Sequence, residues 1–276
     1  MRALRSIFGF IREVRAMSTR ADGFLPCLRY AIDLIRVKLG RRSQLKDGLR
    51  ELRLRDGVTI SYRLNRGDLQ SIREVWLDEE YRLPADAAPY ETLVDLGGNI
   101  GLTSLWLAKT YGYKTVVTVE PSADNAELVR INLANNDVDA TVIEAAVGPH
   151  DGTAVFAASE ESNMGRLGTD GDSSIEVKLL SMASILGQAG VAGQIDLMKL
   201  DIEGGEEQLV DGDLGWLNNV RRIVAELHPA IVDTEKVIAA IEKSGLTFVP
   251  GSGDLAASSV MDMFIRDQPQ SARQAA

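Results

Sequence analysis

A regular alternation of apolar, β-rich runs with helical stretches, starting near residue 91, is the feature that most constrains the fold. Five such runs follow one another: ETLVDL, KTVVTVE, DATVIEAAV, IDLMKLD and RRIVAE. Strands this uniformly apolar are buried on both faces, as in a parallel sheet that carries helices on either side. A final pair, LTFVP and SVMDMFIRD, is close enough in sequence to be antiparallel. The pattern predicts a doubly wound, mostly parallel α/β sheet.

Residues 1–48 are predicted to form a basic helical region ahead of this sheet. The run MRALRSIFGFIREVRAM places five apolar residues on one side of a helix, namely Leu4, Ile7, Phe8, Ile11 and Val14. We expect this side to pack on the parent domain or on a second subunit, as in a homodimer. Attachment to an anionic membrane surface is the alternative. A hairpin follows in LRELRLRDGVTISYRL, with Asp56-Gly57 as its turn.

Charge is unevenly divided between this region and the rest of the chain. Residues 1–56 hold 14 Lys and Arg against 6 Asp and Glu, a balance of +8. Because the whole chain has a net charge of −10, the remaining residues carry −18. An acidic body disfavours nucleic acid as a partner, because phosphates need a basic face. No run approaches the length of a membrane-spanning helix and no secretory signal is recognisable, so a cytoplasmic protein is expected. The single cysteine, Cys27, excludes an intrachain disulfide.

The glycine loop in LVDLGGNIGLTSLWLA, residues 93–108, carries the first indication of a ligand. Ligands of a doubly wound sheet bind beyond the carboxyl ends of its strands. The dinucleotide fingerprint G-x-G-x-x-G fails here because Asn99 stands where its second glycine would be. The carboxylate of Asp95 would also repel a pyrophosphate. S-adenosylmethionine has no phosphate but offers an ammonium and a sulfonium, so an acid beside the loop suits it.

Other residues at the ends of the strands complete the expected cofactor site. Glu120, at the end of the second strand, is placed to accept hydrogen bonds from the two ribose hydroxyls. A nicotinamide-dependent oxidoreductase is disfavoured by the glycine spacing and by the lack of a Tyr-x-x-x-Lys pair. The predicted cofactor-binding residues are Asp95, Gly97, Gly98, Asn99, Gly101, Glu120, Pro121, Glu144, Ala145 and Asp201.

Five blocks resemble the FkbM family of S-adenosylmethionine-dependent O-methyltransferases over roughly residues 50–266. They are VDLGGNIGLTSLWLA, VVTVEPSADNAELVRINLANN, AAVGPHDG, IDLMKLDIEGGEEQLV and IVAELHP. The resemblance implies the class I methyltransferase fold, a Rossmann-like seven-stranded sheet with one antiparallel strand. It also implies methyl transfer to a hydroxyl, and we expect a carbohydrate acceptor such as a sugar, polysaccharide precursor or glycolipid. A polyketide or other natural-product hydroxyl is the alternative, as is a non-catalytic module that binds the cofactor or a glycan.

The domain expected from this resemblance spans residues 49–267. Within it, residues 153–180 interrupt the alternation and are interpreted as an acceptor-side hairpin insertion, in which Ser162, Asn163 and Arg166 could contact the acceptor. Residues 268–276 are expected to be a disordered tail. Trp76 and Tyr81, just before the first core strand, are candidates for covering the cofactor or stacking on a sugar.

Acidic residues and a histidine follow the fourth and fifth strands, where an acceptor would approach the methyl group. The candidate catalytic residues are Asp201, Glu203, His228 and, in the turn GPHDG, His150. In one mechanism Mg²⁺ is held by Asp201 and Glu226, with Glu203 as a further ligand, and lowers the pKa of the acceptor hydroxyl. In the other, no metal is bound and His228 acts as general base while a carboxylate orients its ring, with His150 as the alternative base. A metal together with a histidine base is the combined version. Lys199 is expected to make a structural ion pair with a neighbouring acid.

Overall fold

The computed structural model describes residues 2–85, 90–157, 166–167, 174–251 and 261–266. Its centre is a seven-stranded sheet of order β12-β13-β11-β10-β3-β4-β5. In that order the strands are Thr247–Val249, Asp262–Ile265, Arg222–Ala225, Leu197–Leu200, Thr92–Leu96, Thr115–Glu120 and Ala140–Glu144. Of these seven strands only β13 runs in the opposite direction to the rest, and it pairs antiparallel with both β11 and β12. The predicted mostly parallel sheet with one antiparallel strand is confirmed.

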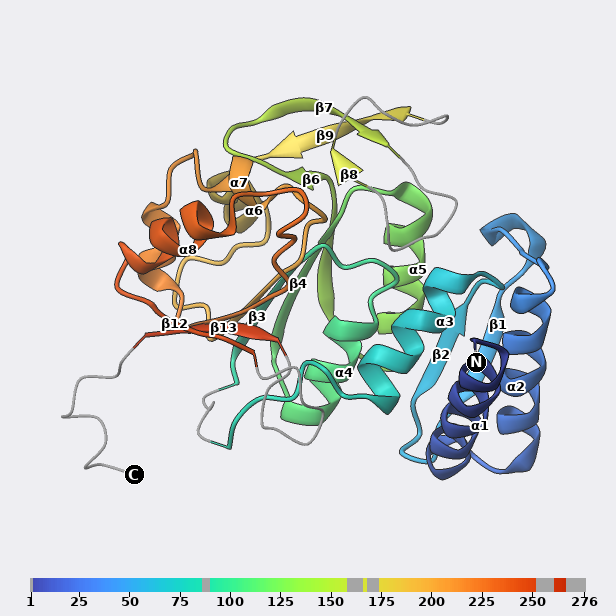
Figure 1. Cartoon of the computed structure of the whole chain (residues 1–276). Coiled ribbons are helices and arrows are strands. Elements are labelled where there is room, and N and C mark those ends of the chain that lie inside the picture. The colour runs from blue at the N-terminus through green and yellow to red at the C-terminus, as the bar shows by residue number, and fades with distance from the viewer. Residues whose placement is uncertain (1, 86–89, 158–165, 168–173, 252–260, 267–276) are drawn as a thin grey trace.

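Helices cover both faces of this sheet (Figure 1). On one face lie α4 (Leu102–Tyr111) and α5 (Ala123–Ala134), and on the other lie α6 (Met182–Gln188), α7 (Glu206–Leu209) and α8 (Thr234–Glu242). Strand β3 shows why, since its side chains alternate between the two faces. Leu93 packs in the core that includes Leu105 of α4, whereas Val94 packs in the core that includes Val237 of α8. Burial on both sides is the reason why the sequence of this strand, TLVDL, is mainly apolar.

The predicted hairpin is present as β1 (Arg50–Arg53) and β2 (Thr59–Tyr62), which pair antiparallel. Gly57 has φ +87°, as a tight turn between such strands requires. The outer edge of β2 is covered by two side-chain amides of α5 and the turn after it. Asn132 and Asn136 accept hydrogen bonds from backbone N–H groups of β2 at 2.7 and 2.8 Å and donate to its carbonyls. The hairpin is thereby joined to the main domain.

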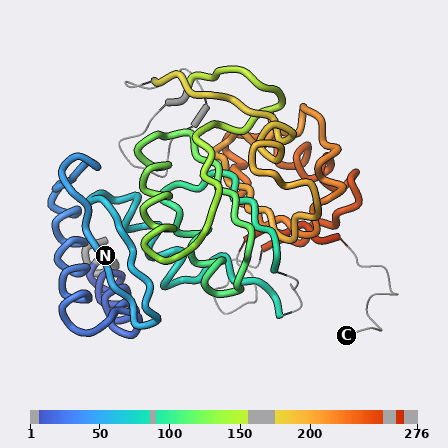
Figure 2. Tube along the Cα trace, turned by 180° about the vertical axis from the view of Figure 1, so that it is seen from behind, coloured from blue at the N-terminus to red at the C-terminus, as the bar shows by residue number. Residues whose placement is uncertain are grey.

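Two antiparallel helices, α1 (Arg2–Arg20) and α2 (Phe24–Lys38), lie beyond this hairpin at the edge of the molecule (Figures 1 and 2). The expectation that the apolar side of the first helix packs on the parent domain is wrong. Ile7, Phe8 and Ile11 are each more than half exposed, because α1 contacts α2 through a different side. No helix among the described residues is both long and apolar enough to cross a membrane.

Two segments differ from the sequence prediction in detail. The run DATVIEAAV divides into β5 and the short β6 (Ala146–Val147), which leaves the central sheet and pairs with β9. The insertion forms a second sheet in which β7 (Gly152–Ala157) pairs antiparallel with β9 (Ser174–Leu180) and β8 (Arg166–Leu167). Ser162, Asn163 and the tail 268–276 lie outside the described residues, as does the side chain of Arg166.

A helix and a short π-helical turn complete the fold. They are α3 (Arg66–Ile72) and residues Arg73–Leu77, which pack beside α4. Asn65 caps α3 by accepting a hydrogen bond from the Asp68 N–H at 2.7 Å. This segment lies over the carboxyl ends of the central strands and forms one wall of the cavity described next.

Candidate functional site

A cavity lies at the carboxyl ends of β3, β4, β10 and β11 and encloses about 1120 Å³ of space, including the part open to solvent. Ligand cavities of several hundred Å³ are typical of sites for small molecules. The polar residues that line it are Gln70, Ser71, Glu74, Glu80, Tyr81, Asn99, Thr103, Glu120, Lys199, Asp201, Glu203 and Glu226. Gly97, Gly98, Pro121 and Ala145 also line it. The predicted strand-end residues thus meet, for the most part, in one place.

The glycines of the loop after β3 allow close backbone packing. Gly97 has φ +85°, and a Cβ atom there would lie 1.7 Å from the carbonyl oxygen of Asp201. A Cβ on Gly98 would lie 2.2 Å from Cγ2 of Thr118. Gly101, which does not line the cavity, allows α4 to approach Val129 of α5. The loop can therefore cross the strand ends only with these glycines, and Gly101 has a packing role.

Glu120 is held at the base of the cavity by backbone donors. The N–H groups of Asn99 and Ser122 donate to its two carboxylate oxygens at 2.8 and 2.9 Å. The backbone of Asn99 has φ +48°, and its side-chain amide donates a hydrogen bond to the hydroxyl of Ser71 at 2.9 Å. Burial raises the pKa of Glu120 to about 7, although these donors and Asn125 act to lower it. A carboxylate with two fixed donors still has lone pairs directed to the cavity, which suits it to accept from ligand hydroxyls.

Asp95 is fully buried and is not among the residues that line the cavity. It accepts a hydrogen bond from Ser104 at 2.6 Å and pairs with Nζ of Lys199 at 3.5 Å. Lys199 also pairs with Asp201 at 3.1 Å and donates to the carbonyl of Gly97. Burial alone would lower the pKa of Lys199, but the two carboxylates raise it well above its usual value. The expected structural ion pair of Lys199 is confirmed, and Asp95 is one of its partners.

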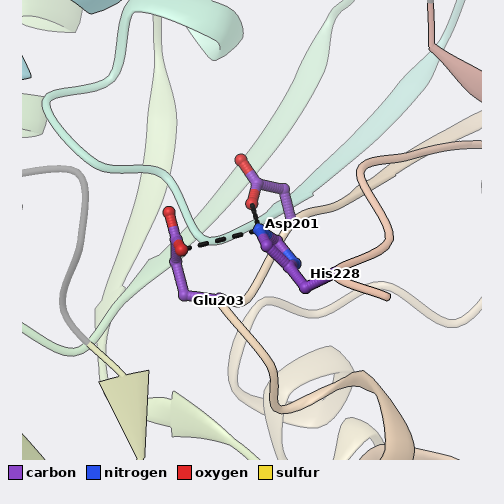
Figure 3. Close-up of side chains that lie close together, drawn as sticks. All are labelled: Asp201, Glu203 and His228. Atoms are coloured by element: carbon purple, nitrogen blue, oxygen red, sulfur yellow. Dashed lines mark ion pairs between the residues drawn. The ribbon is translucent and has the colours of Figure 1, made fainter. Parts of the chain in front are cut away.

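His228 lies beside Asp201 and Glu203, two acids that line the cavity (Figure 3), and a third acid, Glu206, contacts the other side of its ring. Its Nδ1 lies 3.0 Å from Oε1 of Glu206, which is fully buried at the start of α7. Its Nε2 faces Glu203 at 3.5 Å and Asp201 at 3.9 Å. The hydrogen bond to Glu206 raises the pKa of His228 to about 9, despite partial burial. The ring is therefore a cation at neutral pH in this arrangement and cannot accept a proton.

Charge around the cavity is strongly negative. Among its lining residues in the described part of the chain, six are acids and Lys199 alone is a cation, and the acids are Glu74, Glu80, Glu120, Asp201, Glu203 and Glu226. Burial and then Asp201 raise the pKa of Glu203 to about 7, and burial and then Glu74 raise that of Glu80 to about 7. Raised carboxyl pKa values indicate that the site favours a positive charge within it.

One group of three ligand atoms could hold a metal ion. Asp201, Glu203 and His228 offer atoms that all lie within 4.8 Å of one another. Oδ1 of Asp201 is buried without a hydrogen-bond partner among the described residues. The contact from Glu206 to Nδ1 directs Nε2 at the other two ligands, as the second shell of metal sites does. The set differs from the predicted one, because His228 takes the place of Glu226, which lines the cavity without joining this group.

Some sequence candidates are not brought to the cavity. His150 is exposed in its turn and contacts only the Asp151 carbonyl among the hydrogen bonds of the described residues. Glu144 is exposed and lies 3.7 Å from Arg130. Tyr81 lines the cavity as proposed, whereas Trp76 is buried and does not.

Sequence reasoning also missed residues of this site. Ser71 and Glu74 come from α3 and the π-helical turn, Glu80 from the segment that follows, and Glu206 from the first turn of α7. The consecutive acids in EGGEE, directly after a buried strand, were the one available signal for Glu206.

This chain is similar in sequence to known methyltransferases. The sequence profile of the Methyltransferase FkbM domain matches residues 95–248. A 31-O-demethyl-FK506 methyltransferase FkbM from Streptomyces tacrolimicus is 25% identical over 241 residues, which covers 74% of this chain and 92% of that protein. Methyltransferase 1 of Beauveria bassiana is 23% identical over 202 residues, covering 63% and 78%. The solved ribosomal protein L11 methylase from Lactobacillus delbrueckii subsp. bulgaricus covers 73% of this chain and 81% of that chain, with 14% identity and a TM-score of 0.41.

Proposed function

Because this chain belongs to the FkbM family and is an S-adenosylmethionine-dependent methyltransferase, we propose that its cavity binds the cofactor and that it methylates a hydroxyl of a neutral, natural-product-like alcohol. The observation that carries the proposal is the placement of Glu120. This buried carboxylate lies at the end of β4, is fixed by the glycine loop, and is one of six acids that line the same cavity. The arrangement suits a ligand that combines a ribose with positive charge.

The cofactor side of the site is assigned to the loop after β3 and the end of β4. Glu120 accepts hydrogen bonds from the two ribose hydroxyls, and the backbone at Gly97 and Gly98 lets the ligand approach the strand ends closely. Attraction between the acids and the sulfonium and ammonium groups supports binding. Asp95 contributes indirectly, since it holds Lys199 against the Gly97 carbonyl.

The class of acceptor follows from the charge at the end of the cavity opposite the cofactor side. Lys199, the one cation that lines the described cavity, is already paired with two acids, so an acceptor bearing phosphate would be repelled. A neutral alcohol can donate hydrogen bonds to Glu74, Glu80 or Glu226. The relative from Streptomyces tacrolimicus, by its name, acts on 31-O-demethyl-FK506, which favours a natural-product hydroxyl. A carbohydrate is the second candidate, because several carboxylates at one end could bind neighbouring hydroxyls of a sugar.

The acceptor hydroxyl must lose its proton during transfer, and we assign this task to the cluster of Asp201, Glu203 and His228. These residues would hold a divalent cation such as Mg²⁺ once Nε2 of His228 has lost its proton, as their distances and the Asp201 oxygen without a partner indicate. Such an ion, when bound, would lower the pKa of the hydroxyl. Glu206 orients the imidazole by accepting from Nδ1. Without a cation, Glu203 is the better base, because its pKa of about 7 lies near neutrality whereas His228 is already protonated.

Calorimetry with S-adenosylhomocysteine tests the cofactor assignment, with NAD as the comparison ligand and with Mg²⁺ or a chelator present. We expect S-adenosylhomocysteine to bind and NAD not to bind. Glu120→Gln should weaken binding at least tenfold, which is the loss of a hydrogen bond to a charged group, about 1.5–3 kcal/mol. Binding of NAD alone, or an unchanged affinity of the variant, would overturn the assignment.

Release of S-adenosylhomocysteine during turnover tests the acceptor class. A panel of macrocyclic and other polyhydroxylated natural products is compared with free sugars and with sugar phosphates. Turnover with natural products supports the proposal, turnover with sugars alone supports the second candidate, and turnover with sugar phosphates alone would contradict the charge argument. Turnover that is unchanged by a chelator would remove the metal from the mechanism and leave Glu203 as the base.

A further inference from the structure

The N-terminal helices present an apolar surface that nothing in the described structure covers. Nine of the thirteen large apolar side chains that are most exposed in the described residues lie between residues 7 and 39. We call them the two-helix apolar face, which consists of Ile7, Phe8, Ile11, Phe24, Leu25, Leu28, Ile32, Ile35 and Leu39. Phe8 is 69% exposed and Phe24 75%. Exposed apolar side chains gathered in this way mark an interaction surface.

Helix geometry places both apolar stripes on the same side of the helix pair. The contacts between the helices are Lys38 over the ring of Phe10, Tyr30 with Glu13, and Cys27 with the Val14 carbonyl. As the residue number increases from Phe10 to Val14 along α1, that of the contacting residue decreases from Lys38 to Cys27 along α2, so the helices are antiparallel. At about 100° per residue, the exposed stripe of each helix lies about a third of a turn further round than its contact residues. Antiparallel helices wind in opposite senses when viewed from one end, so both stripes turn to one side.

The opposite side of α2 is fixed to the domain. Asp33 is 2% exposed, accepts a hydrogen bond from Tyr62 of β2 at 2.9 Å and pairs with Arg50 of β1 at 3.3 Å. Tyr30 is fully buried on the same flank. Because these anchors hold the inner side, the two-helix apolar face points away from the methyltransferase domain, at the edge of the molecule (Figures 1 and 2).

Positive charge surrounds this face. Exposed basic residues flank the stripes on both helices, among them Arg12, Arg15, Arg29, Arg36 and Lys38. Of the two acids in these helices, Glu13 bonds to Tyr30, and the buried Asp33 pairs with Arg36 at 3.3 Å and with Arg50 of β1. The acids therefore offset only one of these five basic residues. The region is therefore basic as well as apolar, although the chain as a whole carries −10.

We propose that the two-helix apolar face docks on an anionic phospholipid surface, with its apolar side chains among the acyl chains and its arginines at the headgroups. Helices with an apolar stripe bordered by Lys and Arg bind membrane interfaces in this way. A symmetric dimer through the same face is less favourable, because an isologous contact would bring the same basic borders together. Lipid phosphates are complementary to these borders. The inference is independent of the acceptor proposed above.

Co-sedimentation of the full-length protein with vesicles tests the proposal. Vesicles of phosphatidylcholine are compared with vesicles that also contain phosphatidylglycerol, at low and high salt. Binding is expected only with phosphatidylglycerol and should weaken at high salt, because salt screens exposed charges. The triple variant Ile11→Ser, Leu28→Ser, Ile32→Ser should lose binding. The matched control, Ile175→Ser, removes an equally exposed apolar side chain from β9 and should bind like the wild type.

A charge variant separates the two components of the interaction. Arg12→Gln combined with Arg29→Gln should weaken binding about 25-fold, since each arginine near an anionic surface contributes about fivefold. Affinity for S-adenosylhomocysteine and the circular dichroism spectrum should stay unchanged in all variants, which shows that they fold. Equal binding to both kinds of vesicle, or binding to neither, would overturn the proposal. A dimer in solution that dissociates in the triple serine variant, without vesicle binding, would instead assign the face to self-association.

Discussion

The pH dependence of cofactor binding is the sharpest test of the role given to Glu120. In the ligand-free protein burial raises its pKa to about 7, from an ordinary value of 4.5. The ionised carboxylate accepts stronger hydrogen bonds from the two ribose hydroxyls than the protonated carboxyl does, so the bound state favours the carboxylate. Affinity for S-adenosylhomocysteine should therefore be constant above about pH 7.5 and should fall as the pH drops through 7.

The size of the effect follows from that pKa. At about pH 5.5 the ligand-free carboxyl lies about 1.5 units below its pKa, so binding must first remove a proton at a cost of about 2 kcal/mol, or about thirtyfold in Kd. Stability changes in the opposite direction. Because the pKa of the folded state is above that of the unfolded chain, the contribution of Glu120 to stability is fully present below about 4.5 and is lost as the pH rises through 7, by about 3 kcal/mol.

Isothermal titration calorimetry between about pH 5.5 and 8.5 measures the affinity and, in buffers of different ionisation enthalpy, the uptake or release of protons. Glu120→Gln should bind weakly with a flat pH profile. Glu80→Gln is the matched control, since Glu80 lines the same cavity and its pKa is also raised to about 7. If Glu80→Gln flattens the profile while Glu120→Gln keeps it, or if the wild type shows no pH dependence, the assignment of Glu120 as ribose ligand is refuted.

Three further substitutions test the framework of the site. Gly97→Ala should destabilise the protein by more than about 2 kcal/mol in urea unfolding, because its Cβ would meet a backbone oxygen at 1.7 Å, whereas Gly187→Ala, with open space around it, should be neutral or stabilising. Lys199→Met should cost about 3–5 kcal/mol by leaving the buried Asp95 and the partly buried Asp201 without their cation, and a loss under 1 kcal/mol would contradict the ion-pair account. Glu206→Gln should lower the pKa of His228 from about 9 towards 6.5 in an NMR titration, and an unchanged value would show that another group holds the ring charged.

The parts of the fold that depend on local pattern were predictable from the sequence. The central strands are apolar on both faces, and the Asp56-Gly57 turn has a backbone requirement that the sequence displays directly. The π-helical turn was not predictable, since it has no periodic signature, and with it the position of Glu74 was missed. The division of DATVIEAAV into two strands of different sheets depends on the pairing of β6 with β9, a tertiary contact.

The candidate site was predicted in its location but not in the orientation of its side chains. Asp95 and Glu144 stand at strand ends like Glu120, yet one points to Lys199 under α4 and the other to solvent. A position at the end of a strand fixes where the backbone of a residue lies, but it does not determine in which direction the side chain points. The contact between His228 and Glu206 joins residues 22 positions apart across two loops, and no spacing rule predicts it.

The close approach of Gly97 to the carbonyl of Asp201 has an evolutionary consequence. The loop assigned to the methyl donor and the loop assigned to the acceptor touch through their main chains, so that the span between them does not depend on which side chains either loop carries. Positions assigned to the acceptor, such as Glu74, Glu80 and Glu226, could then be exchanged during divergence while the path of the methyl group is preserved. An enzyme built in this way can change its substrate by a few substitutions without rebuilding its catalytic geometry.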